Sequence, residues 1–290
     1  MKNKDYQCNN LPKLPEKDVL GAATGMLDGT IYVCGGYHHY GVFNKKCWML
    51  VDESWKQTFS LKVPRFCLGY STVGNKLVIS GGRSGWNPGY STTEVVTKDG
   101  SEYNVNLPYK QGSHCQVTWN STTHLIVGGA KYNETIFVNI EDKKWSYGPK
   151  LNQGGKEIGC TEFEFNGKQY IIAVGGMGDG GIGAIKTVEY LSKDQPTEWT
   201  KGKDFPVKIG GAMMVTSKSK KTVYTLGGHG PKPDGVVAGD IYESNCPGDS
   251  VTTCTFTKIE PKVITEGGTG GNSGFPVMTI SNELADQLCN

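Results

Sequence analysis

The chain has 290 residues, of which 37% are apolar and 20% charged, and its formal net charge is +2. This balance gives no sign of a nucleic-acid partner or of binding to an anionic membrane, and no apolar stretch is long enough for a transmembrane helix. Glycine is the unusual residue: it occurs 41 times, about twice its average share of roughly 7%. Aromatic residues make up 10% of the chain and argue against disorder, so the glycines predict a packed fold with many tight turns.

Pairs of adjacent glycines recur along the chain, each after a short apolar run of β-forming residues. The pairs begin at Gly35, Gly81, Gly128, Gly175 and Gly227. In every interval a strand of small residues comes before the pair, a third strand follows it, and a fourth strand has an aromatic residue near its start. These aromatic residues are Trp55, Tyr103, Trp145, Trp199 and Phe256. Four short strands in roughly 47 residues are the content of one blade of a β-propeller.

The apolar strand, the glycine pair and the spaced aromatic residues resemble the kelch repeat, and the likeness covers roughly residues 20–260. It implies an all-β, kelch-type β-propeller of four-stranded blades that forms a single domain over residues 1–290. We place the five repeats at about 20–62, 63–108, 109–150, 151–204 and 205–260. The resemblance is specific for the fold and nearly silent on function, because kelch propellers serve unrelated functions.

The two ends of the chain, residues 1–19 and 261–290, together have the length of one more repeat. We therefore predict six blades, with the last one assembled from both termini, which would close the ring and remove its open edges. Five blades with an extra strand are the alternative, because no second strand with a glycine pair is visible in the C-terminal segment.

The nine cysteines fall into two groups. Three pairs are placed to form disulfides: Cys34 with Cys47, Cys246 with Cys254, and Cys8 with Cys289 at the closure. A disulfide framework is typical of an oxidising compartment. The other three, Cys67, Cys115 and Cys160, are interpreted as equivalent residues of the innermost strands, where the first and fifth repeats have alanine. A small buried residue is therefore the preferred interpretation, and zinc or copper ligation beside His114 is the alternative.

Two acceptor sequons for N-glycosylation, Asn120-Ser-Thr and Asn133-Glu-Thr, fall in predicted loops and agree with secretion. The N-terminal sequence MKNKDYQ has no signal-peptide character. The resemblance to extracellular kelch-type proteins of invertebrates nevertheless favours an extracellular, secreted glycoprotein. A cytoplasmic chain with free thiols is the alternative.

The second-to-third connections are long in every repeat. They occupy residues 37–44, 83–91, 130–134, 177–184 and 229–239. Because neighbouring strands of a blade are antiparallel, these connections are expected on the same face as the fourth-to-first connections; we call it the long-loop face. Binding residues usually lie on long loops that a rigid scaffold holds in place.

The chain has only two arginines, Arg65 and Arg83, and both are predicted to project from the long-loop face together with histidine and aromatic residues. Arginine among exposed aromatic side chains is typical of binding hot spots and of carboxylate recognition. The kelch resemblance implies the same, because in kelch adaptors the residue after the glycine pair and arginines of the fourth-to-first connections line a pocket for acidic peptides. The residues after the pairs are Tyr37, Arg83, Ala130, Met177 and His229. The candidate ligand-binding residues are Tyr37, His38, His39, Arg65, Arg83, Trp86, His114, Tyr132, Asp179 and His229.

No nucleophile elbow, P-loop or H-E-x-x-H motif is present in the sequence. We therefore predict a non-enzymatic, secreted binding module without a cofactor that holds a protein, a peptide or a small anionic ligand. One alternative is a metal-dependent enzyme of oxidase or lyase type with a His/Cys site at the mouth of the channel. The other is a cytosolic kelch adaptor or an actin-bundling protein.

Overall fold

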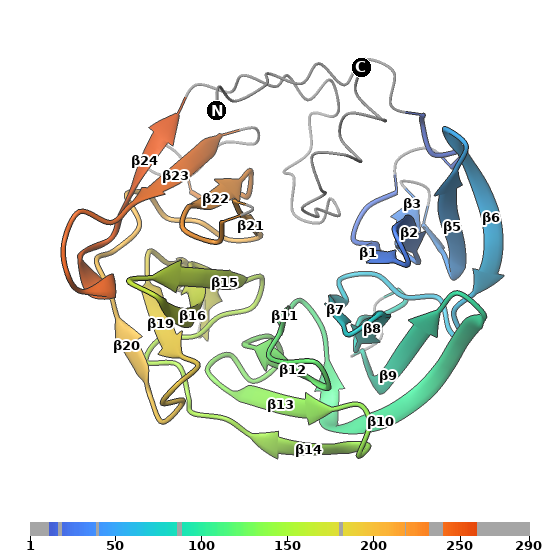
Figure 1. The fold of residues 1–290 in the computed structure, drawn as a ribbon, viewed down its shortest axis with the longest axis horizontal. Coiled ribbons are helices and arrows are strands. Elements are labelled where there is room, and N and C mark those ends of the chain that lie inside the picture. Colours follow the sequence, from blue (N-terminus) through green and yellow to red (C-terminus); the bar gives the residue numbers. More distant parts are fainter. Residues whose placement is uncertain are drawn as a thin grey trace.

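The computed structural model describes residues 12–16, 19–38, 41–85, 89–179, 182–217, 219–231 and 240–259. Five four-stranded antiparallel sheets stand around a central channel like the blades of a propeller (Figure 1). The described residues contain no α-helix, and none of their helical turns has the length and apolar character needed to cross a membrane. The prediction of an all-β propeller with four-stranded blades is confirmed.

Within each blade the strands follow one another from the channel outward (Figure 1). Blade 1 consists of β1 (Ala23–Leu27), β2 (Thr30–Cys34), β5 (Lys46–Val51) and β6 (Ser54–Ser60). Blade 2 consists of β7 (Gly69–Val73), β8 (Lys76–Ser80), β9 (Tyr90–Thr97) and β10 (Gly100–Gln111). Blade 3 consists of β11 (Cys115–Thr118), β12 (Thr123–Val127), β13 (Thr135–Asn139) and β14 (Lys144–Tyr147). Blade 4 consists of β15 (Gly159–Phe165), β16 (Lys168–Val174), β19 (Val188–Ser192) and β20 (Trp199–Lys201). Blade 5 consists of β21 (Met213–Thr216), β22 (Val223–Leu226), β23 (Ile241–Asn245) and β24 (Thr255–Ile259).

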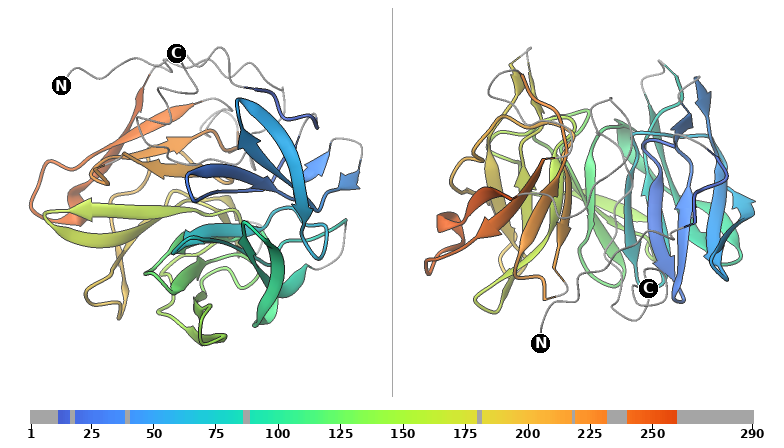
Figure 2. Two further views of the ribbon diagram at one scale, coloured as in Figure 1. Left: turned by 45° about the vertical axis from the view of Figure 1, so that its right-hand side comes forward. Right: turned by 90° about the horizontal axis from the view of Figure 1, so that it is seen from above.

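Two short hairpins extend the second-to-third connections of blades 1 and 4. One pairs β3 (Tyr37–His38) with β4 (Val42–Phe43), and the other pairs β17 (Met177–Gly178) with β18 (Gly183–Ala184). Seen edge-on, the blades run between the two faces of the ring (Figure 2). The connections between strands therefore lie on these two faces, and the hairpins belong to one of them.

The glycine pairs end the second strands because two requirements meet there. Gly175 has a φ of 63°, a conformation that disfavours residues with a Cβ atom. A Cβ atom at this position would also lie only 2.2 Å from the carbonyl oxygen of Ile209. The backbone at the end of the strand thus packs directly against the connection that enters the next blade. Glycine pairs recur along the sequence because similar contacts recur at Gly35, Gly81 and Gly128.

Apolar side chains fill the interfaces between successive blades. One cluster, around Leu77 and Ile79, joins blades 1 and 2, and a second, around Ile126 and Val138, joins blades 2 and 3. Two more clusters join blades 3 and 4 and blades 4 and 5. The central strands are buried on both faces and therefore have continuous apolar runs, whereas a sheet with one solvated face alternates apolar and polar residues.

The structure shows five blades, which agrees with the alternative of five blades plus an extra strand. The sixth blade that we expected from 1–19 and 261–290 falls almost entirely on residues outside the described ranges. One repeat boundary also shifts, because β10 continues to Gln111 instead of ending near residue 108.

The ladder registers show which fourth-strand residues are equivalent. In each blade, one residue of the third strand pairs with the last residue of the second strand. Three residues further along the third strand is the reference position. The fourth-strand residue that pairs with this reference position is the equivalent residue of the blade. The equivalent residues are Trp55, Ser101, Trp145, Trp199 and Phe256, opposite Leu50, Val96, Val138, Leu191 and Ser244. Tyr103 lies near the start of β10, as predicted, but two residues beyond the position equivalent to the other four aromatic residues, which Ser101 occupies.

Two of the expected disulfides, Cys34–Cys47 and Cys246–Cys254, are present. The third, between Cys8 and Cys289, lies outside the described residues. The interpretation of Cys115 and Cys160 as free core thiols is wrong, because they form a disulfide.

The three cysteines do not occupy equivalent positions in their blades. Cys115 is the first residue of its innermost strand, Cys160 is the second, and Cys67 precedes its strand by two. The offset brings the Cα atoms of Cys115 and Cys160 to 5.8 Å from each other across the interface of blades 3 and 4, within the usual range for a disulfide. Cys67 remains a free thiol.

Alkylation of free thiols in the denatured, unreduced protein tests these disulfides. We expect Cys67 to be modified and Cys34, Cys47, Cys115 and Cys160 to be protected until a reductant is added. Peptide mass mapping before and after reduction gives the measurement, and the reduced sample serves as the control in which all cysteines react. Modification of Cys115 or Cys160 without reductant would contradict the inter-blade disulfide.

Candidate ligand site at the mouth of the channel

The entrance to the channel on the long-loop face is formed by the fourth-to-first connections. Two residues before each innermost strand the backbone takes a positive φ, between 50° and 66°. We call these five residues the mouth ring: Gly21, Cys67, Ser113, Glu157 and Gly211. The N–H of Ser113 donates to the carbonyl of Cys67 (2.8 Å), that of Glu157 to Ser113 (2.6 Å) and that of Gly211 to Glu157 (2.8 Å). Blades 2 to 5 are thereby tied in sequence at the entrance.

Three members of the mouth ring, Cys67, Ser113 and Glu157, keep a side chain in a conformation that favours glycine. For a residue with a Cβ atom this conformation costs roughly 1–2 kcal/mol, and blades 1 and 5 avoid the cost with Gly21 and Gly211. Strained backbone that persists in a folded protein clusters at functional sites. All three residues line the central cavity, so they are candidate ligand contacts.

The residues that follow the glycine pairs stand beside the mouth ring. Four of them form the same antiparallel bridge with an incoming connection: Tyr37 with Leu20, Arg83 with Phe66, Met177 with Lys156, and His229 with Gly210. The fifth, Ala130, donates its N–H to Gln111 Oε1 (2.6 Å). The second-to-third and fourth-to-first connections therefore share one face, and the repeat places five side chains around the entrance.

Arg83 rests on a cluster of aromatic rings. Its guanidinium carbon lies 5.0 Å from the centroid of the Phe66 ring, and the rings of Tyr37, Phe43 and Phe66 lie 5.2 to 5.4 Å from one another. The Nε of Arg83 is buried and has no hydrogen-bond partner among the described residues. The aromatic cluster thus supports the guanidinium from one side, and the Nε donor is enclosed rather than offered to a ligand.

Glu157 and His229 form a hydrogen-bonded pair across the interface of blades 4 and 5. The distance between Glu157 Oε2 and His229 Nε2 is 2.6 Å, and both side chains are about one-third exposed. The hydrogen bond to His229 holds the pKa of Glu157 below its usual range, with further help from Arg83 and Lys156. The same hydrogen bond raises the pKa of His229. The pair therefore favours the charged form of both groups.

The thiol of Cys67 lies beside Arg83 and Ser113 in the same entrance. Burial raises the pKa of this thiol, and the nearby guanidinium and hydroxyl oppose the rise without cancelling it. Because the thiolate is the nucleophilic form of cysteine, the site does not activate Cys67 at neutral pH.

Arg65 lies in a fourth-to-first connection, as predicted, but its side chain does not project from the long-loop face, and the prediction that it binds a ligand there is wrong. Its side chain is fully buried between blades 1 and 2, where Nη2 donates to Glu94 Oε1 (2.7 Å) and Nη1 to the carbonyl of Gly81 (2.6 Å). The carboxylate of Glu94 is equally buried. Arg65 is a structural cation whose donors are used inside the protein.

His114 is also buried, and its assignment to the surface is wrong. Its ring Nε2 is hydrogen-bonded to Ser80 Oγ (2.8 Å). Burial lowers the pKa of His114 to about 3, so the ring is neutral at physiological pH. The cause lies in the neighbouring blade, where Gly69 and Gly81 leave room for the ring.

Tyr132 and Asp179 line a separate cavity of about 520 Å³ on the long-loop face, between blades 3 and 4, together with Asn133 and Ile182. The amine of Lys156, the residue before Glu157 of the mouth ring, lies 5.3 Å from the centroid of the Tyr132 ring. Among the other predicted residues, His39 and Trp86 fall outside the described ranges, as does the side chain of His38.

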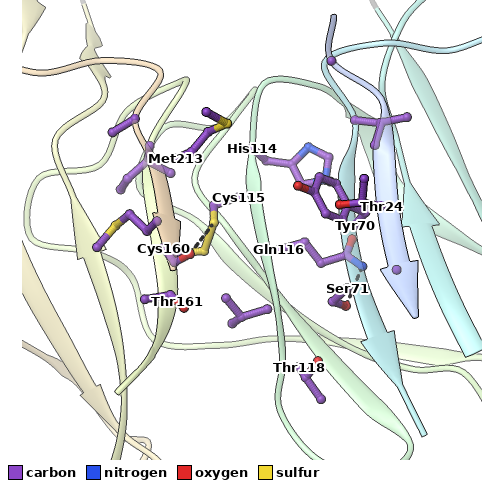
Figure 3. A pocket seen from close by; sticks show the side chains of 18 of the residues that line it. Thr24, Tyr70, Ser71, His114, Cys115, Gln116, Thr118, Cys160, Thr161 and Met213 are labelled. Carbon is purple, nitrogen blue, oxygen red and sulfur yellow. Dashed lines mark hydrogen bonds between the residues drawn. A yellow bond between two sulfur atoms is a disulfide. The ribbon is translucent and has the colours of Figure 1, made fainter. Parts of the chain in front are cut away.

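Behind the mouth ring the channel holds a cavity of about 550 Å³ lined by the innermost strands. Thr24, Ser71 and Gln116 form a polar wall, and the Cys115–Cys160 disulfide with Met213 forms an apolar, sulfur-rich wall (Figure 3). Within the part of the chain that the structure describes, no three His, Cys, Asp or Glu side chains are grouped to hold a metal ion.

The sequence predicted Tyr37, Arg83 and His229 at this site because each of them directly follows a glycine pair. It missed the roles of Ser113, Lys156 and the aromatic support from Phe66. The signal that could have found Ser113 and Glu157 is their constant distance of two residues before the innermost strands.

Fold and site together define a five-bladed β-propeller with a charged entrance to its channel. No protein-family model matches the chain, and no curated protein matches it. Among solved structures, one titled "Structure of YjhT" is similar, with a TM-score of 0.67 and 12% sequence identity over 86% of each chain. At this identity the likeness shows the fold alone.

Proposed function

We propose that the protein is a secreted, non-enzymatic binding module that holds an anionic group at the mouth of its channel. The observation that carries this proposal is the state of Arg83, whose guanidinium is supported by Phe66 at the entrance and forms no ion pair with a carboxylate among the described residues. A planar guanidinium matches a carboxylate or a similar anion through two parallel hydrogen bonds. Arg65 cannot take this part, since Glu94 already binds it.

The surrounding charges support an anionic ligand. Glu157 is bonded to His229, so its negative charge is compensated within the pair when the histidine is protonated. Arg83 and Lys156 then remain as cations that face a ligand, and the rings of Tyr37 and Phe43 offer apolar contact beside them. The ligand would be a small carboxylate or an acidic side chain of a peptide or protein.

Extracellular location is part of the proposal. Three disulfides support an oxidising compartment. Both sequon asparagines, Asn120 and Asn133, are exposed, and Asn120 accepts two backbone hydrogen bonds through Oδ1, which leaves its amide nitrogen as the group to be glycosylated.

Side-chain NMR signals of the two arginines test the site directly. We expect titration with acetate or with a triglutamate peptide to shift the Nε–Hε signal of Arg83 and to leave that of Arg65 in place, because Arg65 is sealed between blades. Arg83→Gln should weaken binding about 10-fold or more, since a hydrogen bond to a charged group contributes about 1.5–3 kcal/mol.

A matched control separates the site from general charge. Lys76→Gln removes a cation that pairs with Glu141 at the surface and should leave binding unchanged. A stronger response to the peptide than to acetate would identify a protein or peptide ligand, and equal responses would identify a small anion. If neither probe moves the Arg83 signal, or if Arg83→Gln binds as well as the natural protein, the proposal is wrong.

A further inference from the structure

The hydrogen-bonded pair of Glu157 and His229 is held by backbone contacts that do not depend on charge. Gly210 and His229 exchange two backbone hydrogen bonds, one from each N–H, and both are 2.8 Å long. The next residue, Gly211, donates its N–H to the carbonyl of Glu157 (2.8 Å). A segment of two residues therefore fixes the backbone of both partners, and their side chains remain neighbours in either protonation state of His229.

Protonation of His229 changes the charge of this pair and leaves its hydrogen bond possible. Nε2 of an imidazole carries a proton in the charged form and in one of the two neutral tautomers, so it can donate to Glu157 Oε2 in both states. With a protonated ring the pair has no net charge, and with a neutral ring it has the full negative charge of the carboxylate. Both side chains are about one-third exposed, so this charge lies open at the entrance.

The two cations of the proposed anion site stand beside the pair. Arg83 and Lys156 both help to lower the pKa of Glu157, which places their charges within electrostatic reach of its carboxylate. When His229 is protonated, three cations face one carboxylate, and when it is neutral only two do. Loss of one proton thus halves the excess of positive charge at the mouth of the channel.

The other described groups around the pair keep their charge between pH 6 and 8.5. Burial raises the pKa of the Cys67 thiol, which faces the same entrance and stays neutral. Ser113 and Met177 pack against the pair and its connections and do not titrate. His114 and His124 are enclosed, and burial lowers the pKa of each to about 3, so both rings are neutral in this range.

We infer that His229 makes the mouth of the channel a pH-regulated anion site, which binds a carboxylate ligand tightly when the ring is protonated and weakly when the charge of Glu157 is uncompensated. The inference rests on the proposed function and adds its regulation. A change of one unit charge beside a partly exposed ligand should alter the affinity about 5-fold. Because the hydrogen bond to Glu157 raises the pKa of His229, the ring stays protonated above pH 6.5. The affinity should therefore fall as the pH rises from neutral to mildly alkaline.

Calorimetric titration of the natural protein with N-acetylated triglutamate, at pH 6.0 and 8.5 and constant ionic strength, tests this inference. The carboxyl groups of the peptide have a pKa of about 4.3 and are ionised at both pH values. We expect the Kd to be about 5-fold higher at pH 8.5. Titrations at pH 7.5 in two buffers of different ionisation enthalpy should show that binding takes up protons. By reciprocity the peptide should move the titration of the His229 ring, followed by its Hε1 NMR signal, to higher pH.

Two variants assign the effect to the pair. His229→Gln keeps a hydrogen-bond donor and cannot take up a proton, so its Kd should be the same at both pH values and equal to that of the natural protein at pH 8.5. Glu157→Gln removes the negative charge, so binding at pH 8.5 should tighten about 5-fold. Lys76→Gln, which alters a distant surface pair with Glu141, is the matched control and should keep the full pH dependence.

The possible failures are distinguishable from one another. An equal Kd at pH 6.0 and 8.5, with Arg83→Gln still weakening binding, would overturn the regulation and leave the anion site intact. A pH dependence that persists in His229→Gln would assign it to another group, such as His38 or His39, and would also refute the inference. Absence of binding at both pH values would refute the proposed function itself. Proton uptake and the His229 titration are measured on the natural protein, so they decide the matter even if a variant does not fold.

Discussion

Replacing Arg65 by methionine is expected to lower the free energy of unfolding by about 3–5 kcal/mol, because the change leaves a buried carboxylate without its counter-ion. The side chains of Arg65 and Glu94 are both fully buried, with 2.7 Å between Nη2 and Oε1. The guanidinium also donates to the backbone carbonyl of Gly81 and to Thr92 Oγ1. Loss of Arg65 therefore removes several partners at once from the interface of blades 1 and 2.

Urea denaturation curves of the natural protein and the variant give the measurement. Lys76→Met is the matched control: it breaks a solvent-exposed pair with Glu141 and should cost less than about 1 kcal/mol. In the double variant Arg65→Met, Glu94→Met, part of the loss should be recovered, since both charges are then absent from the interior. A cost below about 1 kcal/mol for Arg65→Met would contradict the structural assignment of this pair.

The position equivalent to Glu94 in blade 4 shows why the sequence does not predict the ion pair between Arg65 and Glu94. Glu189 is the equivalent of Glu94, and it is also buried. Its acceptors are filled by the backbone N–H groups of Asn152 and Gln153 and by the Asn152 side chain, all at 2.8 Å. Two equivalent carboxylates thus fix an incoming connection in different ways, and the local sequence does not say which one recruits an arginine.

The fold was predictable because its signals are local and repeated. The contact of Gly175 with the carbonyl of Ile209 has counterparts at Gly35, Gly81 and Gly128, each beside a carbonyl of the chain that leads into the next blade, so the glycine pairs carry the spacing of the blades within the described residues. The Cys115–Cys160 disulfide depends instead on an offset of one residue between neighbouring inner strands. Such an offset is a property of how blades pack, and no local pattern encodes it.

The candidate site likewise has residues that the repeat predicts and contacts that it does not predict. Arg83 and His229 were found because their position after the glycine pair makes a bridge that repeats from blade to blade. The pairing of Glu157 with His229 could not be foreseen, since it joins residues of different blades whose approach depends on the positive φ of Glu157. Local repetition therefore predicts where side chains stand, and packing between blades decides which of them meet.

Acidification from pH 7.5 to 5 is expected to lower the free energy of unfolding by about 4 kcal/mol through two buried histidines. Burial lowers the pKa of both His114 and His124 to about 3, against about 6.5 in an unfolded chain. Because the folded pKa is the lower one, the unfolded chain takes up protons first, and stability present above pH 6.5 is lost as the pH falls toward 3. Each histidine contributes about 1.4 kcal/mol per pH unit in this window.

Variants at the two kinds of histidine should change the pH profile in opposite directions. His124→Leu removes one buried titrating ring and should reduce the loss between pH 7.5 and 5 by about half. His229 has a raised pKa because of its hydrogen bond to Glu157, so its pair stabilises the fold below pH 6.5 and this contribution is lost as the pH rises. His229→Gln should therefore make the acid-induced loss steeper. An unchanged profile in His124→Leu would contradict the assignment.

The acid-induced loss should also be localised. His124 shares a face of β12 with Ile126, which packs against Val105 of blade 2, and His114 is bonded to Ser80 of that blade. Among the described residues the interface of blades 2 and 3 has no disulfide, whereas Cys115–Cys160 ties blades 3 and 4. Hydrogen exchange at pH 5, corrected for intrinsic rates, should therefore show protection lost in β8 and β12 before β15 and β16. A uniform loss of hydrogen-exchange protection across all blades would contradict the assignment of the acid sensitivity to His114 and His124.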